Sequence, residues 1–285
     1  MLQPLPRRGS VSGARDDDAV SAAPQPRLLL GLVAVVSGSA IGIGRAVSIM
    51  AAAGGARVVG LDIDVDGNAE TQRRVHEIGG SMEAVRCDVG EADTVAEAIG
   101  ALDRIDVVVN NAAVWNDTTL TGGDYAKQTA AFSRAMDACA FGSFHLAAAA
   151  LPKLREAGSR PAGANIVNLI TEHIRMHRLI TGMPATGYDS AKFVQWRLTE
   201  SWAKELAPIG IRVNGLAFGA TDTPMLRAVS ARIAEAGMRA EDIAQAVFNI
   251  VHQGPGGATG VTYDVGFSGT PRSESLAQIE AILTR

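Results

Sequence analysis

A tyrosine and a lysine four residues apart form the pair in this sequence that is best suited to proton transfer. Tyr188 and Lys192 lie in the segment 188–192, which reads YDSAK. On a helix this spacing places both side chains on one face, one turn apart. An ammonium group beside a phenol stabilises the phenolate, so the tyrosine can serve as a general acid or base. Because Tyr-x-x-x-Lys is a common chance pattern, the pair alone also fits two exposed helix side chains.

A glycine-rich segment, 37–44 (SGSAIGIG), has the composition of a turn that binds a dinucleotide. It follows the apolar run 28–36, which predicts a buried strand, and precedes 45–53, which predicts a helix. Glycines permit a tight turn and let a pyrophosphate approach the helix N-terminus, where unpaired N–H groups and the helix dipole favour negative charge. The segment therefore predicts a dinucleotide site, although a glycine-rich connection without a ligand has the same composition.

Asp62, at the end of the next apolar run 56–62, indicates which dinucleotide this site would take. Its distance from the glycines is close to that at which an acidic side chain meets the adenosine ribose. A carboxylate there accepts hydrogen bonds from both ribose hydroxyls and repels a 2′-phosphate, and neither Ile41 nor Ile63 offers that phosphate a cation. The sequence therefore predicts NAD rather than NADP, unless Asp62 is only part of a solvated acidic turn.

The composition limits the classes of protein that are possible. A chain of 285 residues, 47% hydrophobic and 20% charged, can bury one sizeable core. Its formal charge of −4 provides no basic surface, so we expect no nucleic-acid partner. Two cysteines do not make a disulfide framework in a chain of this length and favour a reducing, cytoplasmic location. The apolar stretches are too short to cross a bilayer, so no membrane partner is expected.

From residue 28 onward, β-type runs alternate with helical patterns, which is typical of parallel strands joined by crossover helices. We therefore predict an α/β fold, a doubly wound parallel sheet of about seven strands flanked by helices in a single domain. Residues 1–27 are predicted to be a disordered tail, 28–267 the domain that carries the cofactor and substrate sites, and 268–285 a C-terminal extension with a short helix at 273–283. The predicted strands are 30–36, 56–62, 82–87, 105–110, 164–170, 211–217 and 261–265, and the predicted helices are 43–53, 67–78, 91–102, 126–157, 188–206 and 239–252.

Over about residues 28 to 267 the chain resembles the short-chain dehydrogenase/reductase family, in its branch with subunits of roughly 250 residues. The resemblance implies a Rossmann-type fold, a nicotinamide cofactor and a subunit that assembles as a homo-oligomer, a tetramer or a dimer. It is carried by segments that follow one another in family order: SGSAIGIG at 37–44, LDID at 61–64, CDV at 87–89, NNAA at 110–113, NIVNLIT at 165–171, YDSAK at 188–192, IRVN at 211–214 and GATDTP at 219–224.

The resemblance also assigns cofactor contacts, residue by residue. Those expected at the adenosine half are Gly38 and Ile43 at the pyrophosphate, Asp62 at the adenosine ribose, Asp88 and Val89 at the adenine, and Asn111 at a ribose. Those expected at the nicotinamide half are Gly219, the backbone of Thr221, the hydroxyl of Thr223, and Tyr188 with Lys192. Simpler interpretations remain open for three of them: a strand-end acid for Asp88, a turn amide for Asn111 and a helix N-cap for Thr223.

The sequence departs from the family pattern at three expected site positions. Thr171 replaces the serine that orients the substrate oxygen; it keeps the hydroxyl and adds a methyl group, or it simply ends a strand. Cys139 replaces an asparagine that helps anchor a water chain to the lysine, and a thiol is a weak donor and a poor acceptor. Phe218 replaces a proline, either to stack on substrate or to fill the core.

The polar segment 172–177 follows the predicted catalytic strand. His173 and His177 have a spacing found in metal sites, but no third ligand is evident and we predict no metal. A substrate-pocket wall in which Glu172 or His173 contacts a polar group fits the segment better. Further candidates for that wall are Trp115, Asn116, Met176, Leu179, Ile180, Met183 and Met225, each of which also fits core packing.

Together these features predict an NAD-dependent oxidoreductase that interconverts a secondary alcohol and a ketone. Tyr188 is the expected general acid/base, Lys192 its electrostatic partner and Thr171 the hydroxyl that orients the substrate oxygen. Because Cys139 lacks the usual amide, a cofactor-binding sensor or scaffold with little turnover is an alternative. An epimerase or dehydratase of the same family is another.

Overall fold

Seven parallel strands form the central sheet of the computed structural model, which describes residues 28–115, 118–175, 185–267 and 270–285. Their order across the sheet is β3-β2-β1-β4-β5-β6-β9, and every neighbouring pair is parallel. The predicted doubly wound sheet is therefore confirmed. The strands are β1 (Val33–Ser37), β2 (Arg57–Asp62), β3 (Ser81–Arg86), β4 (Val107–Asn110), β5 (Ala164–Thr171), β6 (Ile211–Phe218) and β9 (Thr262–Val265).

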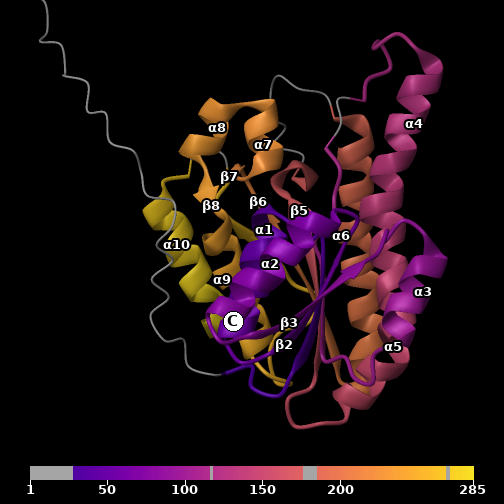
Figure 1. Cartoon of the computed structure of the whole chain (residues 1–285). Coiled ribbons are helices and arrows are strands. Elements are labelled where there is room, and N and C mark those ends of the chain that lie inside the picture. The colour runs from indigo at the N-terminus through magenta and orange to yellow at the C-terminus, as the bar shows by residue number, and fades with distance from the viewer. Residues whose placement is uncertain (1–27, 116–117, 176–184, 268–269) are drawn as a thin grey trace, which may run out of the picture.

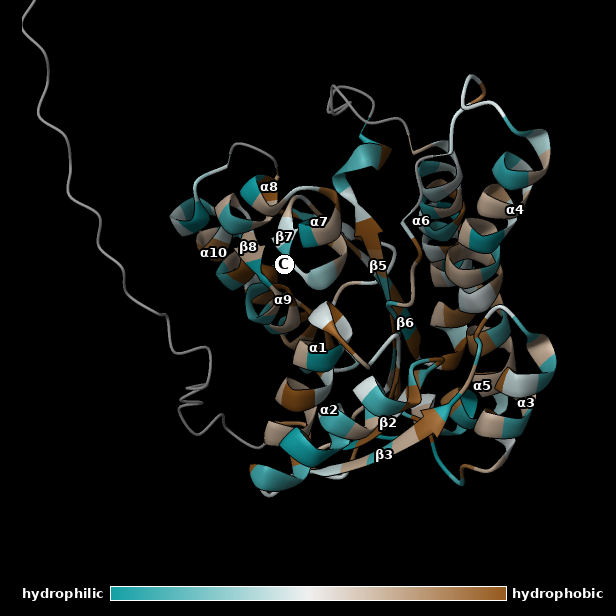
Figure 2. Ribbon diagram, turned by 45° about the horizontal axis from the view of Figure 1, so that its top comes forward, coloured by the Kyte–Doolittle hydropathy of each residue, from teal (hydrophilic) through white to brown (hydrophobic). Residues whose placement is uncertain are grey.

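Helices cover both faces of this sheet, as Figure 1 shows. On one face, α1 (Gly42–Ala53), α2 (Val65–Glu77) and α9 (Ala240–His252) enclose one apolar core. On the other, α3 (Ala92–Gly100), α5 (Gly142–Gly158) and α6 (Thr186–Leu206) enclose a second. Strands covered on both faces consist of continuous apolar runs, such as the fully buried VAVVS of β1. Figure 2 shows the same pattern, with hydrophobic strands inside and helices of mixed character outside.

The predicted single helix over 126–157 is wrong, because the structure divides it into three parts. α4 (Tyr125–Ala135) leads into a π-helical segment, Met136–Phe141, which leads into α5. At the end of that segment the Gly142 N–H donates to the carbonyl of Asp137, five residues earlier, instead of four. Apolar periodicity cannot show such a change in hydrogen bonding, because the extra residue per turn is local. The π-helical segment contains Cys139.

Four short elements between β6 and α9 were not predicted from the sequence. They are β7 (Thr221–Asp222), α7 (Pro224–Val229), α8 (Ala231–Ala236) and β8 (Met238–Arg239). Elements of two to six residues are too short to establish a periodicity, and β7 and β8 are defined only by their pairing with each other. They form a small two-stranded layer with two helices beyond the carboxyl end of β6.

The C-terminal segment packs on the same core as α9. The predicted helix at 273–283 appears as α10 (Arg272–Glu280) followed by a 3-10 turn, Ala281–Thr284. Asn249 Nδ2 donates to the carbonyl of Ile279 at 2.9 Å, and Arg272 pairs with the buried Asp242. Within the described residues, no helix is both long enough and apolar enough to span a membrane. The predicted tail, 1–27, lies outside them.

Candidate active site

The sheet topology brings the predicted site residues to one edge. β1 lies between β2 and β4 although β4 comes much later in the chain, so successive crossovers run in opposite directions from β1. Ligands of doubly wound sheets bind at such a switch point, beyond the carboxyl ends of the strands. Four of the predicted site residues lie at or just after the carboxyl end of a strand: Gly38 after β1, Asn111 after β4, Thr171 at the end of β5 and Gly219 after β6.

The glycine turn between β1 and α1 leaves no room for side chains on its inner side. Gly38 has φ +68°, and a Cβ there would lie 2.7 Å from Asn111 Nδ2 and 2.9 Å from Ala112 Cα. Ile41, the N-cap of α1, makes no side-chain cap, and the first turn of α1 has no acidic residue. Backbone N–H groups at this end of α1 are therefore available to an anion. The turn fits the pyrophosphate of a dinucleotide.

Asp62 and Asn111 hold this turn through its backbone. The Ala40 N–H donates to Asp62 Oδ2 at 2.8 Å, and the Asp64 N–H donates to Asp62 Oδ1 at 2.9 Å. Asn111 Nδ2 donates to the carbonyls of Ser37 and Gly38 at 2.8 and 3.0 Å. The Asp62 carboxylate therefore already lies at the turn, and each of its oxygens keeps a lone pair for a further donor.

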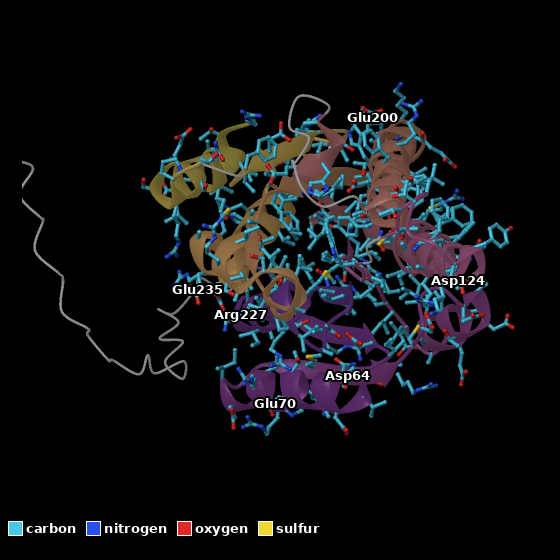
Figure 3. The ribbon with its side chains drawn as sticks, turned by 90° about the horizontal axis from the view of Figure 1, so that it is seen from above. Asp64, Glu70, Asp124, Glu200, Arg227 and Glu235 are labelled. Carbon is cyan, nitrogen blue, oxygen red and sulfur yellow. The ribbon has the colours of Figure 1, made fainter. Side chains whose placement is uncertain are left out.

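The acidic neighbours of Asp62 have a different role. Asp64 is the N-cap of α2 and accepts a hydrogen bond from the Gly67 N–H at 3.0 Å. Figure 3 shows Asp64 and Glu70 at the outer edge of the molecule. The basic residue after the glycines, Arg45, donates to Thr71 Oγ1 at 2.9 Å and to the carbonyls of Ala40 and Gly67. Its Nε and Nη2 donors thus fix the turn to α2.

Three further residues expected at the cofactor, Thr223, Asp88 and Val89, follow the carboxyl ends of β6 and β3. Thr223 caps α7, as the simpler interpretation had it, by accepting a hydrogen bond from the Leu226 N–H at 3.3 Å. It also lies against the glycine turn, since a Cβ on Gly42 would be 3.4 Å from Thr223 Cγ2. Asp88 is exposed after β3 and accepts from the Gly90 N–H at 2.9 Å, whereas Val89 is buried.

Tyr188, Lys192 and Thr171 meet where β5 ends against α6. Lys192 Nζ lies 5.8 Å from the centre of the Tyr188 ring, and Thr171 is hydrogen-bonded to Tyr188. Lys192 is 3% exposed and Tyr188 is half-buried, so the interpretation as an exposed helix pair is wrong. One turn of α6 separates the phenol from the ammonium, as the four-residue spacing predicts.

Burial dominates the electrostatics of this pair. Desolvation raises the pKa of Tyr188 well above its usual value, Cys139 adds to the rise, and the hydrogen bond with Thr171 opposes it. Desolvation lowers the pKa of Lys192, and Cys139 opposes that change. Burial therefore favours the protonated phenol, and the stabilisation of the phenolate expected from Lys192 does not outweigh it in this state.

Gln195 is a residue of this site that the sequence analysis missed. It is fully buried on α6, and its Oε1 accepts a hydrogen bond from Lys192 Nζ at 2.9 Å. Its Nε2 donates to Ser143 Oγ at 2.8 Å, and Ser143 Oγ donates in turn to the carbonyl of Cys139 at 2.6 Å. The three-residue spacing from Lys192 to Gln195 places both on one helix face and could have identified it.

The segment after β5 brings His173 to the same site. His173 Nδ1 is 2.6 Å from Asp189 Oδ1, and the ring of Trp115 lies 4.9 Å from that of Tyr188 and 6.1 Å from that of His173. Glu172 is buried. The described residues contain no group of three side chains suited to a metal ion. Other residues considered for the pocket wall or a metal lie outside the described residues: Asn116, Met176, His177, Leu179, Ile180 and Met183.

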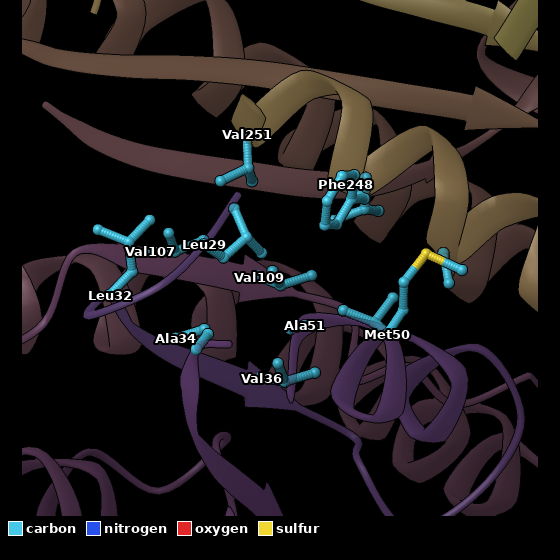
Figure 4. A pocket seen from close by; sticks show the side chains of 14 residues that line it. Leu29, Leu32, Ala34, Val36, Met50, Ala51, Val107, Val109, Phe248 and Val251 are labelled. Atoms are coloured by element: carbon cyan, nitrogen blue, oxygen red, sulfur yellow. The ribbon is translucent and has the colours of Figure 1, made fainter. Parts of the chain in front are cut away.

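Phe218 and an apolar pocket both lie in the hydrophobic core, away from Tyr188 and Lys192. Phe218 is half-buried and packs against the core on the α9 face, which is the core-filling interpretation. The pocket in Figure 4 is lined by apolar side chains of β1, β4, α1 and α9, among them Val36, Val109 and Phe248. Without polar lining side chains it belongs to the core packing and not to the catalytic edge.

Comparisons with known proteins agree with this geometry. The short chain dehydrogenase family model matches residues 32–234. The 7alpha-hydroxysteroid dehydrogenase of Escherichia coli is 31% identical over 205 residues, which cover 70% of this chain and 74% of that protein. The 1-deoxy-11-beta-hydroxypentalenate dehydrogenase of Streptomyces avermitilis is 32% identical over 225 residues, covering 76% and 79% of the two chains. The crystal structure of 3-ketoacyl-(acyl-carrier-protein) reductase from Brucella melitensis complexed with NADH is 26% identical with a TM-score of 0.72, covering 83% and 97%. The chain is therefore an oxidoreductase of the short-chain dehydrogenase/reductase family.

Proposed function

We propose that this protein interconverts a secondary alcohol and a ketone with NAD as its cofactor. The observation that carries the proposal is the meeting of Tyr188, Lys192 and Thr171 at the carboxyl end of β5, beside a glycine turn that admits a pyrophosphate. The two named dehydrogenases and the reductase among its relatives support this class of reaction. A bound nicotinamide would supply or accept the hydride.

The residues of the chain would manage the proton and the substrate oxygen. In the direction of reduction, the Tyr188 hydroxyl donates a proton to the carbonyl oxygen, and the Thr171 hydroxyl orients that oxygen by a hydrogen bond. The Tyr188 phenol carries this proton at neutral pH, because even an unperturbed phenol has a pKa of about 10. After donation, the phenolate is stabilised by the ammonium of Lys192 and by Thr171. In oxidation the same groups act in reverse order.

Asp62 supports NAD as the cofactor. Its carboxylate lies at the turn that would hold the pyrophosphate, where a 2′-phosphate would meet negative charge. The Nε and Nη2 donors of Arg45 contact Thr71 and the carbonyls of Ala40 and Gly67, which holds this side chain between the turn and α2. We propose the same contacts for the other cofactor residues as the family resemblance implies.

The experiment that tests this function compares the wild type with Tyr188→Phe. The protein is incubated with NADH and a panel of ketones, or with NAD and the matching alcohols, while the nicotinamide absorbance is followed. We expect turnover of at least one pair by the wild type and a loss of about 10²- to 10⁴-fold in Tyr188→Phe, with NADH still bound. Binding without turnover across the panel would instead support the sensor or scaffold, and isomerised or dehydrated product without net redox change the epimerase or dehydratase.

We also propose a homo-oligomer, a dimer or a tetramer, formed through the outer faces of α5 and α6. Aromatic side chains are exposed there, with Phe144 51% and Phe193 37% exposed. On α5, Ala148 is also exposed, whereas Ala147 is buried. The two cysteines, Cys87 and Cys139, are free thiols and support a cytoplasmic location.

A further inference from the structure

We propose that Gln195 is a positioning residue that holds the ammonium of Lys192 in place for the cofactor, a role that Cys139 cannot fill in this chain. The inference rests on the proposed function, because it concerns the lysine of that site. The side chain that accepts a hydrogen bond from Lys192 is an amide on the same helix, α6, and not a side chain of the π-helical segment that carries Cys139.

The contacts form one continuous hydrogen-bonded line through the buried interior. It runs from Lys192 Nζ to Gln195 Oε1 at 2.9 Å, from Gln195 Nε2 to Ser143 Oγ at 2.8 Å, and from Ser143 Oγ to the Cys139 carbonyl at 2.6 Å. Gln195 Nε2 also donates to the carbonyl of Asn110 at 3.3 Å. α6, α5, β4 and the π-helical segment therefore all fix the orientation of this one amide.

The number of donors on Lys192 explains what this arrangement does. An ammonium group has three N–H donors. Two of them reach acceptors of the protein, the Gln195 amide and the carbonyl of Leu169, the latter at 2.6 Å. With two N–H donors of Lys192 fixed, the third can point in few directions. We propose that it donates to the nicotinamide ribose. Without Gln195 the ammonium would keep one protein acceptor and could rotate about it.

Cys139 is close enough to affect both reacting groups but cannot replace this anchor. It is fully buried and belongs to one buried cluster with Ala191, which lies on α6 between Tyr188 and Lys192. A thiol accepts hydrogen bonds weakly, so it offers the ammonium little. Its backbone carbonyl, however, is the end of the line from Gln195 through Ser143. The amide that Cys139 lacks is thus supplied from α6.

A double-mutant cycle on NADH binding tests the proposal without requiring a substrate. Dissociation constants for NADH are measured by fluorescence titration for the wild type, Gln195→Leu, Lys192→Met and the double variant. We expect Gln195→Leu to weaken binding about tenfold in the wild type, as loss of a buried bond to a charged group would. In the Lys192→Met background the same change should have almost no effect, because the group that Gln195 positions is gone.

Conservative variants and a matched control separate positioning from packing. Gln195→Glu keeps an acceptor for Lys192 but loses the donor to Ser143 Oγ and to the Asn110 carbonyl, so it should restore only part of the affinity lost in Gln195→Leu. Thr199→Val changes another fully buried polar residue of α6 and should affect NADH binding equally in both backgrounds. If Gln195→Leu does not fold, Ser143→Ala removes the partner of the amide with a smaller change in volume and should weaken binding in the same direction.

The outcomes distinguish this inference from the proposed function. Independent effects of Gln195→Leu and Lys192→Met on NADH binding, or an unchanged affinity in Gln195→Leu, would each overturn the role of Gln195. NADH binding by the wild type would still support the proposed function in either case. Failure of the wild type to bind NADH would overturn both.

Discussion

Replacing Asp62 with asparagine should remove the preference for NADH over NADPH without disrupting the glycine turn. The amide oxygen of the new side chain can still accept the hydrogen bond that the Ala40 N–H gives to Asp62 Oδ2 at 2.8 Å. The negative charge disappears, and so does the acceptor of the Asp64 N–H, because an NH2 group takes the place of Oδ1. The substitution therefore separates the electrostatic role of Asp62 from its role in holding the turn.

The size of the effect follows from the charge and exposure of the site. A 2′-phosphate carries about 1.5 to 2 negative charges at neutral pH. At about 5 Å from a half-exposed carboxylate, with an effective dielectric constant of about 60, the repulsion is about 2 kcal/mol. Since 1.4 kcal/mol corresponds to a factor of ten, the ratio of NADPH to NADH dissociation constants should fall by about 30-fold in Asp62→Asn.

Asp64→Asn is the matched control for this measurement. It removes the same charge two residues away, from a side chain that caps α2 at the surface, and screening should limit its effect on the ratio to about threefold. Both dissociation constants are measured by fluorescence titration at fixed ionic strength, after thermal unfolding has shown each variant to be folded. Equal binding of the two cofactors by the wild type, or an unchanged ratio in Asp62→Asn, would refute the reasoning.

Two further predictions concern stability and assembly. Burial favours the protonated form of Asp242, but hydrogen bonds from Arg272 and from the Arg239 backbone outweigh burial and hold the pKa of Asp242 below its usual value. The ionised Asp242 therefore stabilises the folded protein at neutral pH, and this stabilisation is lost as the pH falls through the lowered pKa. Urea unfolding should show Asp242→Asn to be less stable by about 2 kcal/mol at pH 7, with a difference that shrinks below about pH 4; a constant difference would contradict this assignment. Light scattering should show a dimer or tetramer for the wild type and a smaller species for the double variant Phe144→Ser/Phe193→Ser. Leu120→Ser is the control, because Leu120 is fully exposed away from α5 and α6. A monomeric wild type would rule out the proposed assembly.

Much of the fold could be predicted from the sequence because its signals are local. The run VAVVS of β1 has to be buried on both faces, and the glycines after it permit only a tight turn into a helix. The order of such units along the chain then determines a parallel sheet. The division of the 126–157 helix at Met136–Phe141 could not be read in this way, because the shift to i→i−5 hydrogen bonds leaves the pattern of apolar residues nearly unchanged.

In the candidate site, too, the sequence predicted the features that depend on local spacing but not those that depend on tertiary contacts. The four-residue spacing of Tyr188 and Lys192 determined that they share a helix face, and the glycine segment determined where a pyrophosphate could approach. Whether that helix face is buried, and what meets it there, depends on β5 and the π-helical segment, which are distant in the sequence. Only the packing of these elements decided that Thr171 reaches Tyr188 and that Gln195, and not Cys139, accepts a hydrogen bond from Lys192. A buried ammonium takes whichever acceptor the tertiary structure places within reach, and spacing along one chain segment cannot show which acceptor that is.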